Sequence, residues 1–235
     1  MAEIKDNRGF NQVFKDSKVN RLRAQRRYEY YFKLINKNKA NDILEIGCGL
    51  GDLSFSLASN PKNNVLGTDL CLPFIEEAQK KYNLKNLNFE VLDFNHPEKL
   101  EGKKFDYIIG NGILHHLYYE LDSVLLNIKK LLKDNGQIVF LEPNLLNPYC
   151  FLIFNTSDFF RKWAKLEPTE KAFSKTYIKN KLIKAGFSTI VVENKDFLVP
   201  GTPFFLAKPI IIIGNIIERI PVLKLLSQSI FIYAN

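Results

Sequence analysis

The sequence predicts an α/β fold in which crossover helices cover a parallel β-sheet. Strand-like apolar runs alternate with helix-like stretches from residue 42 onward, and a glycine-rich turn follows the first of these runs. The 235 residues are 46% hydrophobic, which is enough for one packed core. Disordered, fibrous and collagen-like classes are therefore excluded.

The alternating elements follow one another in a regular order. The first strand is expected at Asp42–Ile46, and a helix follows through Leu57 and Ala58. A turn at Asn135-Gly136 precedes the fifth strand. The later strands are predicted at residues 65–68, 87–92, 105–110, 137–142, 187–193 and 229–233, and the other helices at 19–35, 72–82, 121–132 and 176–185.

Positive charge is concentrated near the amino terminus. The net charge is +8 at pH 7, and residues 1–39 hold eleven basic and four acidic side chains. We therefore divide the chain into a basic helical arm, residues 1–41, and a single domain, residues 42–235. Such an arm suits nucleic acid, anionic lipid or an acidic ligand, or it is a solvated helix face.

Cysteine usage and the first residues bear on the compartment. Cys48, Cys71 and Cys150 form no CxxC pair, which argues against a disulfide scaffold or a structural zinc site, and we expect no metal. The first residues lack the apolar core of a signal peptide. The expected location is therefore cytoplasmic.

Two apolar insertions interrupt the α/β pattern, at residues 143–173 and 195–226. Within the second, the window 197–217 approaches the ~20 residues that span a bilayer. Prolines and glycines break it at positions 200, 201, 203, 209 and 214, so we expect a folded-back or interfacial segment. Membrane contact and a hydrophobic lid on the core are both compatible with this composition.

The turn after the first strand has the spacing Glu45-x-Gly47-x-Gly49-x-Gly51. Glycines let a ligand approach the backbone closely, because no Cβ intervenes, and the start of the next helix favours negative charge. The spacing differs from GxGxxG, which argues against a nicotinamide oxidoreductase. Asp69 and Asp93 end the second and third strands, and Asp69 is placed to accept hydrogen bonds from ribose hydroxyls.

These motifs together resemble those of class I S-adenosylmethionine-dependent methyltransferases, in particular small-molecule members of types 11 and 12. The resemblance implies a Rossmann-like, doubly wound sheet of seven strands, mostly parallel with an antiparallel last strand, and helices on both faces. S-adenosyl-L-methionine is the implied cofactor. Six segments appear in family order: LEIGCGLG (44–51), VLGTDL (65–70), FEVLDF (89–94), FDYIIGNGILHHL (105–117), LLKDNGQIVFLEPN (131–144) and LIKAGF (182–187).

The resemblance also assigns residues to parts of the cofactor. The methionine part is expected at the glycine turn, the ribose at the second strand, the adenine at the third and the sulfonium after the fourth. The residues concerned are Glu45, Gly47, Cys48 and Gly49, then Asp69 and Leu70, then Asp93 and Phe94, and last Asn111 and Gly112. For Asp69 and Asp93, capping of a strand end is the alternative role.

His116 is the candidate catalytic residue. In similar enzymes a histidine shortly after the fourth strand often faces the acceptor, and a neutral imidazole can take the proton of a hydroxyl. Adjacent residues on a helix point about 100° apart, so only one of His115 and His116 is expected to face the site. The alternative is that His116 only shapes the pocket, because methyl transfer depends mainly on positioning.

The expected function is methyl transfer to a small lipophilic or lipid-linked acceptor, at oxygen in preference to carbon or nitrogen. The family's variable substrate elements fall in the two apolar insertions, where we expect peripheral membrane contact aided by the basic arm. A methyltransferase acting on RNA through the arm is disfavoured, because residues 111–114 are not an NPPY-type tetrapeptide. A non-catalytic cofactor-binding protein is a further alternative, and the oligomeric state stays open.

Overall fold

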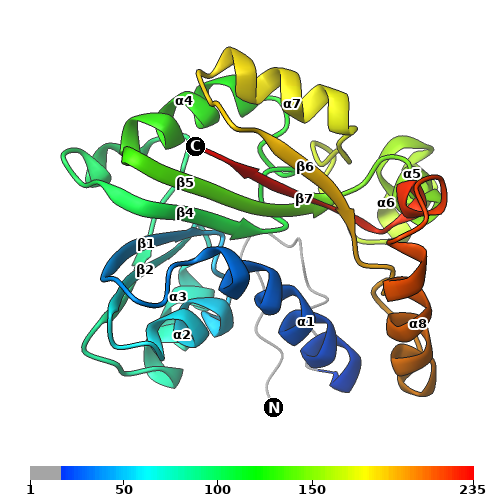
Figure 1. Cartoon of the computed structure of the whole chain (residues 1–235), viewed down its shortest axis with the longest axis horizontal. Coiled ribbons are helices and arrows are strands. Elements are labelled where there is room, and N and C mark those ends of the chain that lie inside the picture. Colours follow the sequence, from blue (N-terminus) through cyan, green and yellow to red (C-terminus); the bar gives the residue numbers. More distant parts are fainter. Residues whose placement is uncertain (1–16) are drawn as a thin grey trace.

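The computed structural model describes residues 17–235, so the first sixteen residues of the predicted arm lie outside it. One sheet has the strand order β3-β2-β1-β4-β5-β7-β6 (Figure 1). The strands are β1 (Asn41–Ile46), β2 (Asn63–Asp69), β3 (Leu87–Val91), β4 (Phe105–Asn111), β5 (Leu132–Pro143), β6 (Val191–Lys195) and β7 (Ser229–Ala234).

Strand direction follows the prediction. The pairs from β3 to β5 are all parallel, whereas β7 pairs antiparallel with both β5 and β6. Only the last strand is therefore reversed. The predicted seven-stranded, doubly wound sheet is confirmed.

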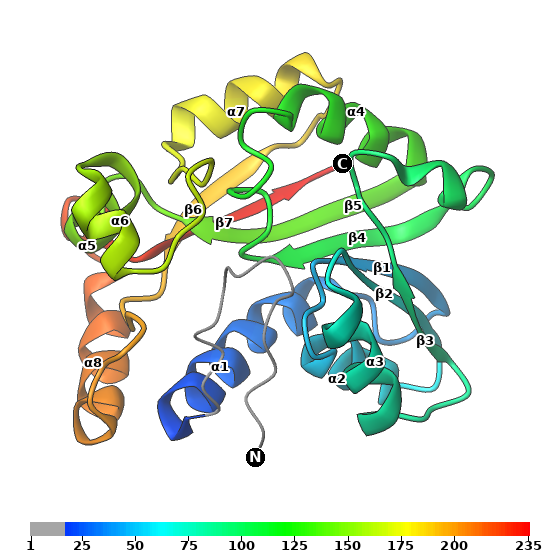
Figure 2. The ribbon, with the colours of Figure 1, turned by 180° about the vertical axis from the view of Figure 1, so that it is seen from behind.

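Helices cover both faces of the sheet (Figure 2). One layer is α1 (Lys18–Leu34), α2 (Asp52–Ala58) and α3 (Leu72–Lys81), and the other is α4 (Leu121–Leu131) and α7 (Lys175–Lys184). In both views three further helices lie together beyond one end of the strands. These are α5 (Pro148–Asn155), α6 (Asp158–Trp163) and α8 (Phe204–Ile217), and the short 3-10 helices are η1 (Pro97–Leu100) and η2 (Leu223–Leu226).

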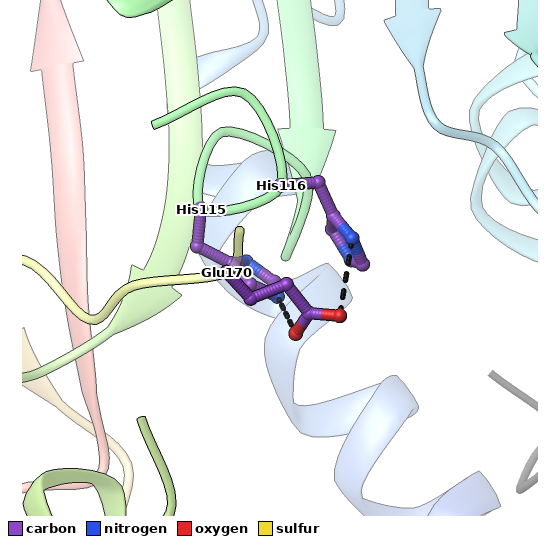
Figure 3. Close-up of side chains that lie close together, drawn as sticks. All are labelled: His115, His116 and Glu170. Carbon is purple, nitrogen blue, oxygen red and sulfur yellow. Dashed lines mark ion pairs between the residues drawn. The ribbon is translucent and has the colours of Figure 1, made fainter. Parts of the chain in front are cut away.

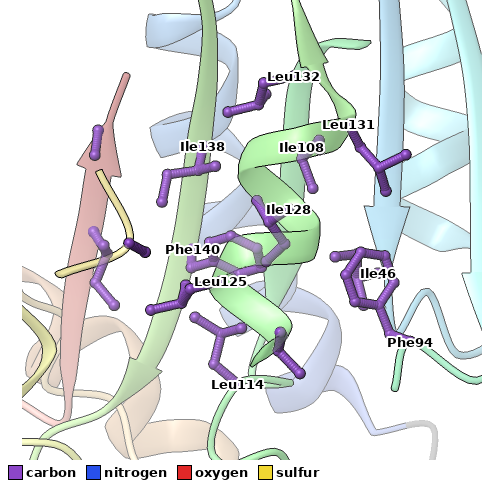
Figure 4. Packing of buried hydrophobic residues seen from close by; sticks show 14 of the residues in the cluster. Ile46, Phe94, Ile108, Leu114, Leu125, Ile128, Leu131, Leu132, Ile138 and Phe140 are labelled. Carbon is purple, nitrogen blue, oxygen red and sulfur yellow. The ribbon is translucent and has the colours of Figure 1, made fainter. Parts of the chain in front are cut away.

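Each face of the sheet has its own apolar core. Leu125 and Ile128 of α4 pack on Ile108 and Phe140 in one core (Figure 4). In the other core Tyr31 of α1 is fully buried, and its hydroxyl donates to the carbonyl of Gly110 at 2.7 Å. The first helix is thus packed against the sheet over its carboxyl-terminal half.

The predicted boundaries differ most from the structure at the sixth and fifth strands. The sixth strand begins at Val191 rather than at Phe187, because Phe187 closes the end of α7 by donating its N–H to the carbonyl of Leu182. The predicted turn at Asn135-Gly136 lies inside β5. Between the pairs Phe105–Leu132 and Tyr107–Gln137, β5 contains several more residues than β4, so the pairing is irregular there.

The second apolar insertion folds back on itself. Residues after β6 return along α8, so that a Cβ added at Gly214 would lie 3.3 Å from Phe197. The helix continues through Pro209 for 14 residues, which corresponds to roughly 21 Å at the α-helical rise. Between residues 17 and 235, no helix combines the length and the apolar character that a bilayer crossing requires.

A buried ionic network joins α1 to the end of the sheet. The Asp196 side chain is fully buried, and its Oδ2 accepts from Arg27 Nε at 3.2 Å. Arg27 also donates to Gln228 and Ser229, while Arg26 pairs with Glu218 at 2.9 Å. Burial of this carboxylate is favourable only because several guanidinium donors compensate for the lost water.

We predict that Asp196→Asn lowers the free energy of unfolding by about 3–5 kcal/mol, because it leaves buried guanidinium groups without their counter-ion. Asn tolerates the positive φ of +67° at this position, so the backbone is preserved. The control is Asp122→Asn, whose exposed pairs with Lys181 and Lys184 contribute less than about 1 kcal/mol. Urea unfolding of both variants measures the difference, and equal losses would contradict the assignment.

Candidate functional site

The predicted cofactor residues lie at the carboxyl edge of four neighbouring parallel strands. Residue pairs near the strand ends, such as Ile46–Thr68 on β1 and β2, place this edge at one level across the sheet. In open α/β sheets ligands bind outside the carboxyl ends of the strands, where the strand order reverses. Here β1 has β2 on one side and β4 on the other, so that switch lies at β1.

The glycine turn leaves space for a ligand and contacts the loop after β4. Gly47, Gly49 and Gly51 have φ values of +67°, +52° and +79°, which residues with a Cβ rarely adopt. A Cβ at Gly49 would meet nothing within 4 Å, whereas one at Gly47 would lie 2.7 Å from Ile113. The turn is therefore open at Gly49 and packed at Gly47.

Glu45 is buried beneath this turn. Its Oε2 accepts a hydrogen bond from the Ser54 hydroxyl on α2. Burial raises the pKa of Glu45 to about 8, although the hydrogen bond from Ser54 opposes this shift. Burial also raises the pKa of the Cys48 thiol, whose Sγ lies 3.7 Å from the carbonyl oxygen of Gly49. Cys48 is therefore a packing residue of the turn and not a thiolate.

Asp69 connects the glycine turn to the end of β2. Its two carboxylate oxygens accept from the N–H groups of Gly49 and Cys71, each at 2.9 Å. Leu70, beside it, is 44% exposed. At the end of β3, Asp93 accepts from the N–H of Asn95 at 2.9 Å, while the Phe94 side chain is buried in the core. Both aspartates therefore order their turns, and a carboxylate oxygen can accept a further hydrogen bond from a ligand hydroxyl.

Asn111 and Gly112 lie where β4 ends. The side-chain oxygen of Asn111 accepts from Arg27 Nη1 at 3.1 Å, and the N–H of Gly112 donates to the carbonyl of Leu141 at 2.8 Å. Arg26 and Arg27 of α1 are engaged in ion pairs within the protein. Arg27 supports the site from behind through Asn111.

Glu142 at the end of β5 organises the loop that follows β4. Its side chain is fully buried, and its oxygens accept from the N–H groups of Ile113, Leu114 and His115 at 3.0, 2.8 and 3.3 Å. The Nδ1 of His115 lies 2.8 Å from the same carboxylate. Since a carboxylate accepts, Nδ1 carries the proton, and Nε2 points away from Glu142.

The two histidines lie in turns and not on a helix, so the helical geometry behind the expectation that only one of them faces the site does not apply. Their ring centroids are 4.3 Å apart, and Glu170 lies beside both rings (Figure 3). Its Oε2 is 3.5 Å from His115 Nε2 and its Oε1 is 3.4 Å from His116 Nδ1. Burial alone would lower the pKa of His115, but the hydrogen bond to Glu142 and the nearby Glu170 carboxylate raise it to about 9.

Sequence reasoning missed Glu142 and Glu170. Glu142 follows an apolar strand at the same edge as Asp69, and that signal was available in the FLEPN segment. Glu170 lies within the apolar insertion, more than fifty residues after His116, and no local pattern connects it to the histidines. Only the folded insertion brings them together, with the Lys171 N–H donating to the His115 carbonyl.

A family model described as a methyltransferase domain matches residues 37–189. The chain belongs to the class I S-adenosylmethionine-dependent methyltransferases. It is therefore an enzyme that uses S-adenosyl-L-methionine to methylate a small molecule. This agrees with the activity class and cofactor that the sequence motifs implied.

A demethylmenaquinone methyltransferase of Lactobacillus johnsonii is 30% identical over 183 residues, covering 69% of this chain and 74% of the relative. The next curated relatives are longer, and the chain spans less than half of their length. A methyltransferase structure from Archaeoglobus fulgidus has a TM-score of 0.63 at 20% identity, covering 93% and 94% of the two chains. Phosphoethanolamine N-methyltransferase 2 of Haemonchus contortus, solved with S-adenosyl-L-methionine, has a TM-score of 0.62 at 19% identity, covering 90% and 52%.

The carboxyl edge of the sheet in this methyltransferase fits S-adenosyl-L-methionine. S-adenosyl-L-methionine carries an ammonium, a sulfonium and ribose hydroxyls but no phosphate, so carboxylates attract it. Glu45, Asp69 and Asp93 lie at three successive strand ends, and the space in front of Gly49 is one that a Cβ would occupy. These side chains supply acidic, hydrogen-bonding groups, which a cationic nucleoside requires.

We predict that Glu45 makes the ligand-free methyltransferase less stable as the pH rises. A pKa of about 8 in the folded state exceeds the ordinary 4.5, so the folded state binds one more proton between these values. The free energy of unfolding of wild type, relative to Glu45→Gln, should therefore fall by about 1.4 kcal/mol per pH unit across this window. The measurement is urea unfolding from pH 5 to 8.

Both proteins keep His115, so the contribution of that histidine cancels in the difference. Parallel pH profiles of wild type and Glu45→Gln would show that Glu45 is ionised in the folded protein and would contradict the prediction.

Proposed function

We propose that this methyltransferase acts on an oxygen of a small, lipophilic or lipid-linked acceptor. The observation that carries the proposal is the apolar lining beside the two histidines. The Phe154 ring packs edge-on against His115 at 5.5 Å, and Phe154 belongs to a buried cluster with Cys150, Ile153 and Ala172. The Lactobacillus johnsonii relative is named for demethylmenaquinone, a lipophilic quinone, which supports this acceptor class.

In this proposal each group of predicted residues contacts a different part of the cofactor. Asp69, next to Leu70, holds the ribose hydroxyls, and Asp93 with the backbone of Phe94 meets the adenine. Glu45 with the turn from Gly47 to Gly49 faces the methionine part, and Asn111 and Gly112 lie beside the sulfonium. The cofactor supplies a methyl group on an already activated sulfonium, so the protein's task is mainly to position the acceptor.

His116 is proposed to act on the acceptor hydroxyl. Its side chain is 18% exposed, so the imidazole is accessible, and Glu170 and Glu167 both lie near its Nδ1. A carboxylate beside Nδ1 favours the tautomer whose Nε2 takes a proton. Gly112 lies close by, since a Cβ there would be 3.6 Å from the ring of His115. The sulfonium and acceptor sides of the proposed site are therefore neighbours.

We predict that wild type binds S-adenosylmethionine by calorimetry and that Asp69→Asn weakens this binding about 100-fold. Asn keeps the shape of Asp but loses the charge and one acceptor oxygen, and hydrogen bonds to charged groups contribute roughly 1.5–3 kcal/mol each. Labelled methyl groups should appear in lipid extracts and not in RNA.

Asp134→Ala, which changes an exposed residue of β5, is the control and should bind S-adenosylmethionine like wild type. Unchanged binding by Asp69→Asn would refute the assignment of the ribose site. Incorporation of label into RNA would refute the acceptor class.

We further propose peripheral contact of α8 with an anionic lipid surface at the cytoplasmic face of a membrane. Phe205, Ile212 and Ile216 are 76%, 62% and 58% exposed, and Val222 beyond the helix is 73% exposed. Isolated exposed apolar side chains are ordinary, but a run of them on one helix marks an interaction surface. Basic residues flank it, since Lys18 and Lys208 line a hollow of about 280 Å³ between α1 and α8.

We predict that Phe205→Glu combined with Ile212→Glu reduces binding to phosphatidylserine vesicles at least tenfold. Removing two apolar side chains from lipid costs roughly 1.5–3 kcal/mol each, and a tenfold change corresponds to about 1.4 kcal/mol. Leu126→Glu on α4, where Leu126 is 48% exposed, is the control and should bind like wild type. Sedimentation with vesicles measures the binding. A wild-type protein that ignores the vesicles would overturn the proposal.

A further inference from the structure

We propose that His115, His116 and Glu170 form a binding site for a divalent transition-metal ion of the zinc class. Their ligand atoms all lie within 4.8 Å of one another (Figure 3). The loop after β4 supplies both imidazoles, and the insertion between β5 and α7 supplies the carboxylate. This inference concerns a ligand that the proposed methyl transfer does not itself require.

The distances between the side chains match a metal site better than a set of hydrogen bonds. The two imidazole-to-carboxylate distances of 3.4 and 3.5 Å are long for hydrogen bonds to a carboxylate. In tetrahedral coordination with bonds of about 2.0–2.1 Å, neighbouring ligand atoms lie roughly 3.3–3.5 Å apart. One ion between the rings and Glu170 would be within reach of all three side chains, whose ligand atoms lie within 4.8 Å of one another.

The contact that His115 makes through its other ring nitrogen is typical of a metal-binding histidine. Such histidines almost always donate their other ring N–H to a carboxylate or carbonyl, which fixes the tautomer. Glu142 provides this contact to His115 Nδ1 at 2.8 Å and thereby directs Nε2 toward Glu170. Glu142 is held in turn by three backbone N–H groups, so the orientation of His115 is set before any ion arrives.

Glu170 is held just as firmly. Its Oε1 accepts from the Glu167 N–H at 2.9 Å, and Arg161 donates to the carbonyl oxygens of Glu167 and Glu170. The Lys171 N–H donates to the His115 carbonyl at 3.3 Å, which fixes the carboxylate relative to the ring. Ligands fixed in this way lose little conformational entropy when they bind an ion.

The local charge balance also calls for a cation. Glu142 and Glu170 are both buried, with side chains 0% and 1% exposed. Between residues 17 and 235, the ion pairs of these two carboxylates are with histidines alone, because Arg161 donates to backbone carbonyls. Metal binding requires neutral imidazoles, so in the metal-bound state a divalent cation would neutralise the two buried negative charges of Glu142 and Glu170.

Three protein ligands leave at least one coordination position open, as in catalytic zinc sites. The Phe154 ring packs edge-on against His115, and Gly112 adjoins the same imidazole. A catalytic role of the ion at this open position rests on the proposed methyl transfer to oxygen. A hydroxyl bound to the ion gives its proton to solvent, its oxygen forms the bond to the methyl carbon, and the sulfur keeps the electron pair of the broken S–C bond. His116 is then a ligand, and the ion replaces it in activating the hydroxyl.

The test is calorimetric titration of Zn²⁺ into the full-length, untagged protein after treatment with a chelator. We expect one ion per chain, with affinity reduced at least 100-fold in Glu170→Gln and in His116→Ala. His96→Ala removes an exposed histidine outside the cluster and serves as the matched control, which should bind Zn²⁺ like wild type. Co²⁺ in place of Zn²⁺ should give the absorption spectrum of a four-coordinate site in wild type and His96→Ala but not in Glu170→Gln or His116→Ala.

S-adenosylhomocysteine is titrated into the same samples to separate this inference from the proposed function. Weak or absent Zn²⁺ binding by wild type that binds S-adenosylhomocysteine would overturn the metal site and leave the methyltransferase assignment intact. Equal Zn²⁺ affinity of wild type and Glu170→Gln would likewise overturn it. Glu170→Gln that still binds S-adenosylhomocysteine demonstrates that the variant is folded.

Discussion

The buried carboxylate of Glu142 is the constraint on which the candidate site depends. It accepts hydrogen bonds from three backbone N–H groups of the loop after β4 and from the ring N–H of His115. A buried carboxylate is tolerated only when such donors replace its lost water, so the loop cannot relax without leaving a buried charge unsatisfied. The shape of the loop, and the direction in which His115 points, therefore follow from one side chain on the neighbouring strand.

This loop couples the two halves of the site. Ile113 packs against Gly47, so the cofactor turn and the loop after β4 are in direct contact. From the other side Arg27 donates to Asn111 while it pairs with Asp196, which ties the first helix and the end of β6 to the same edge. The segments that differ most from a minimal α/β domain, α1 and the insertions, are thus anchored to the residues at the strand ends.

Local patterns were sufficient to predict the sheet and the strand ends at which the candidate cofactor residues lie. Apolar runs, the glycine turn and Asp69 act through their immediate neighbours in the chain, and sequence spacing records such effects directly. Glu170 and Asp196 were not predictable, because their partners lie far away in the sequence and only tertiary packing brings them together. The start of β6 was misplaced for a related reason, since Phe187 has the apolar character of a strand residue but closes the end of α7.

The central claim is that the carboxyl edge of β1 to β4 binds S-adenosylmethionine or its product. Hydrogen–deuterium exchange with and without S-adenosylhomocysteine tests it most directly, because it reports on every segment of that edge at once. We expect slower exchange in residues 45–52, 67–71, 91–95 and 110–116, with residues 121–132 unchanged. Unchanged exchange at the strand ends, or protection confined to α8, would contradict it.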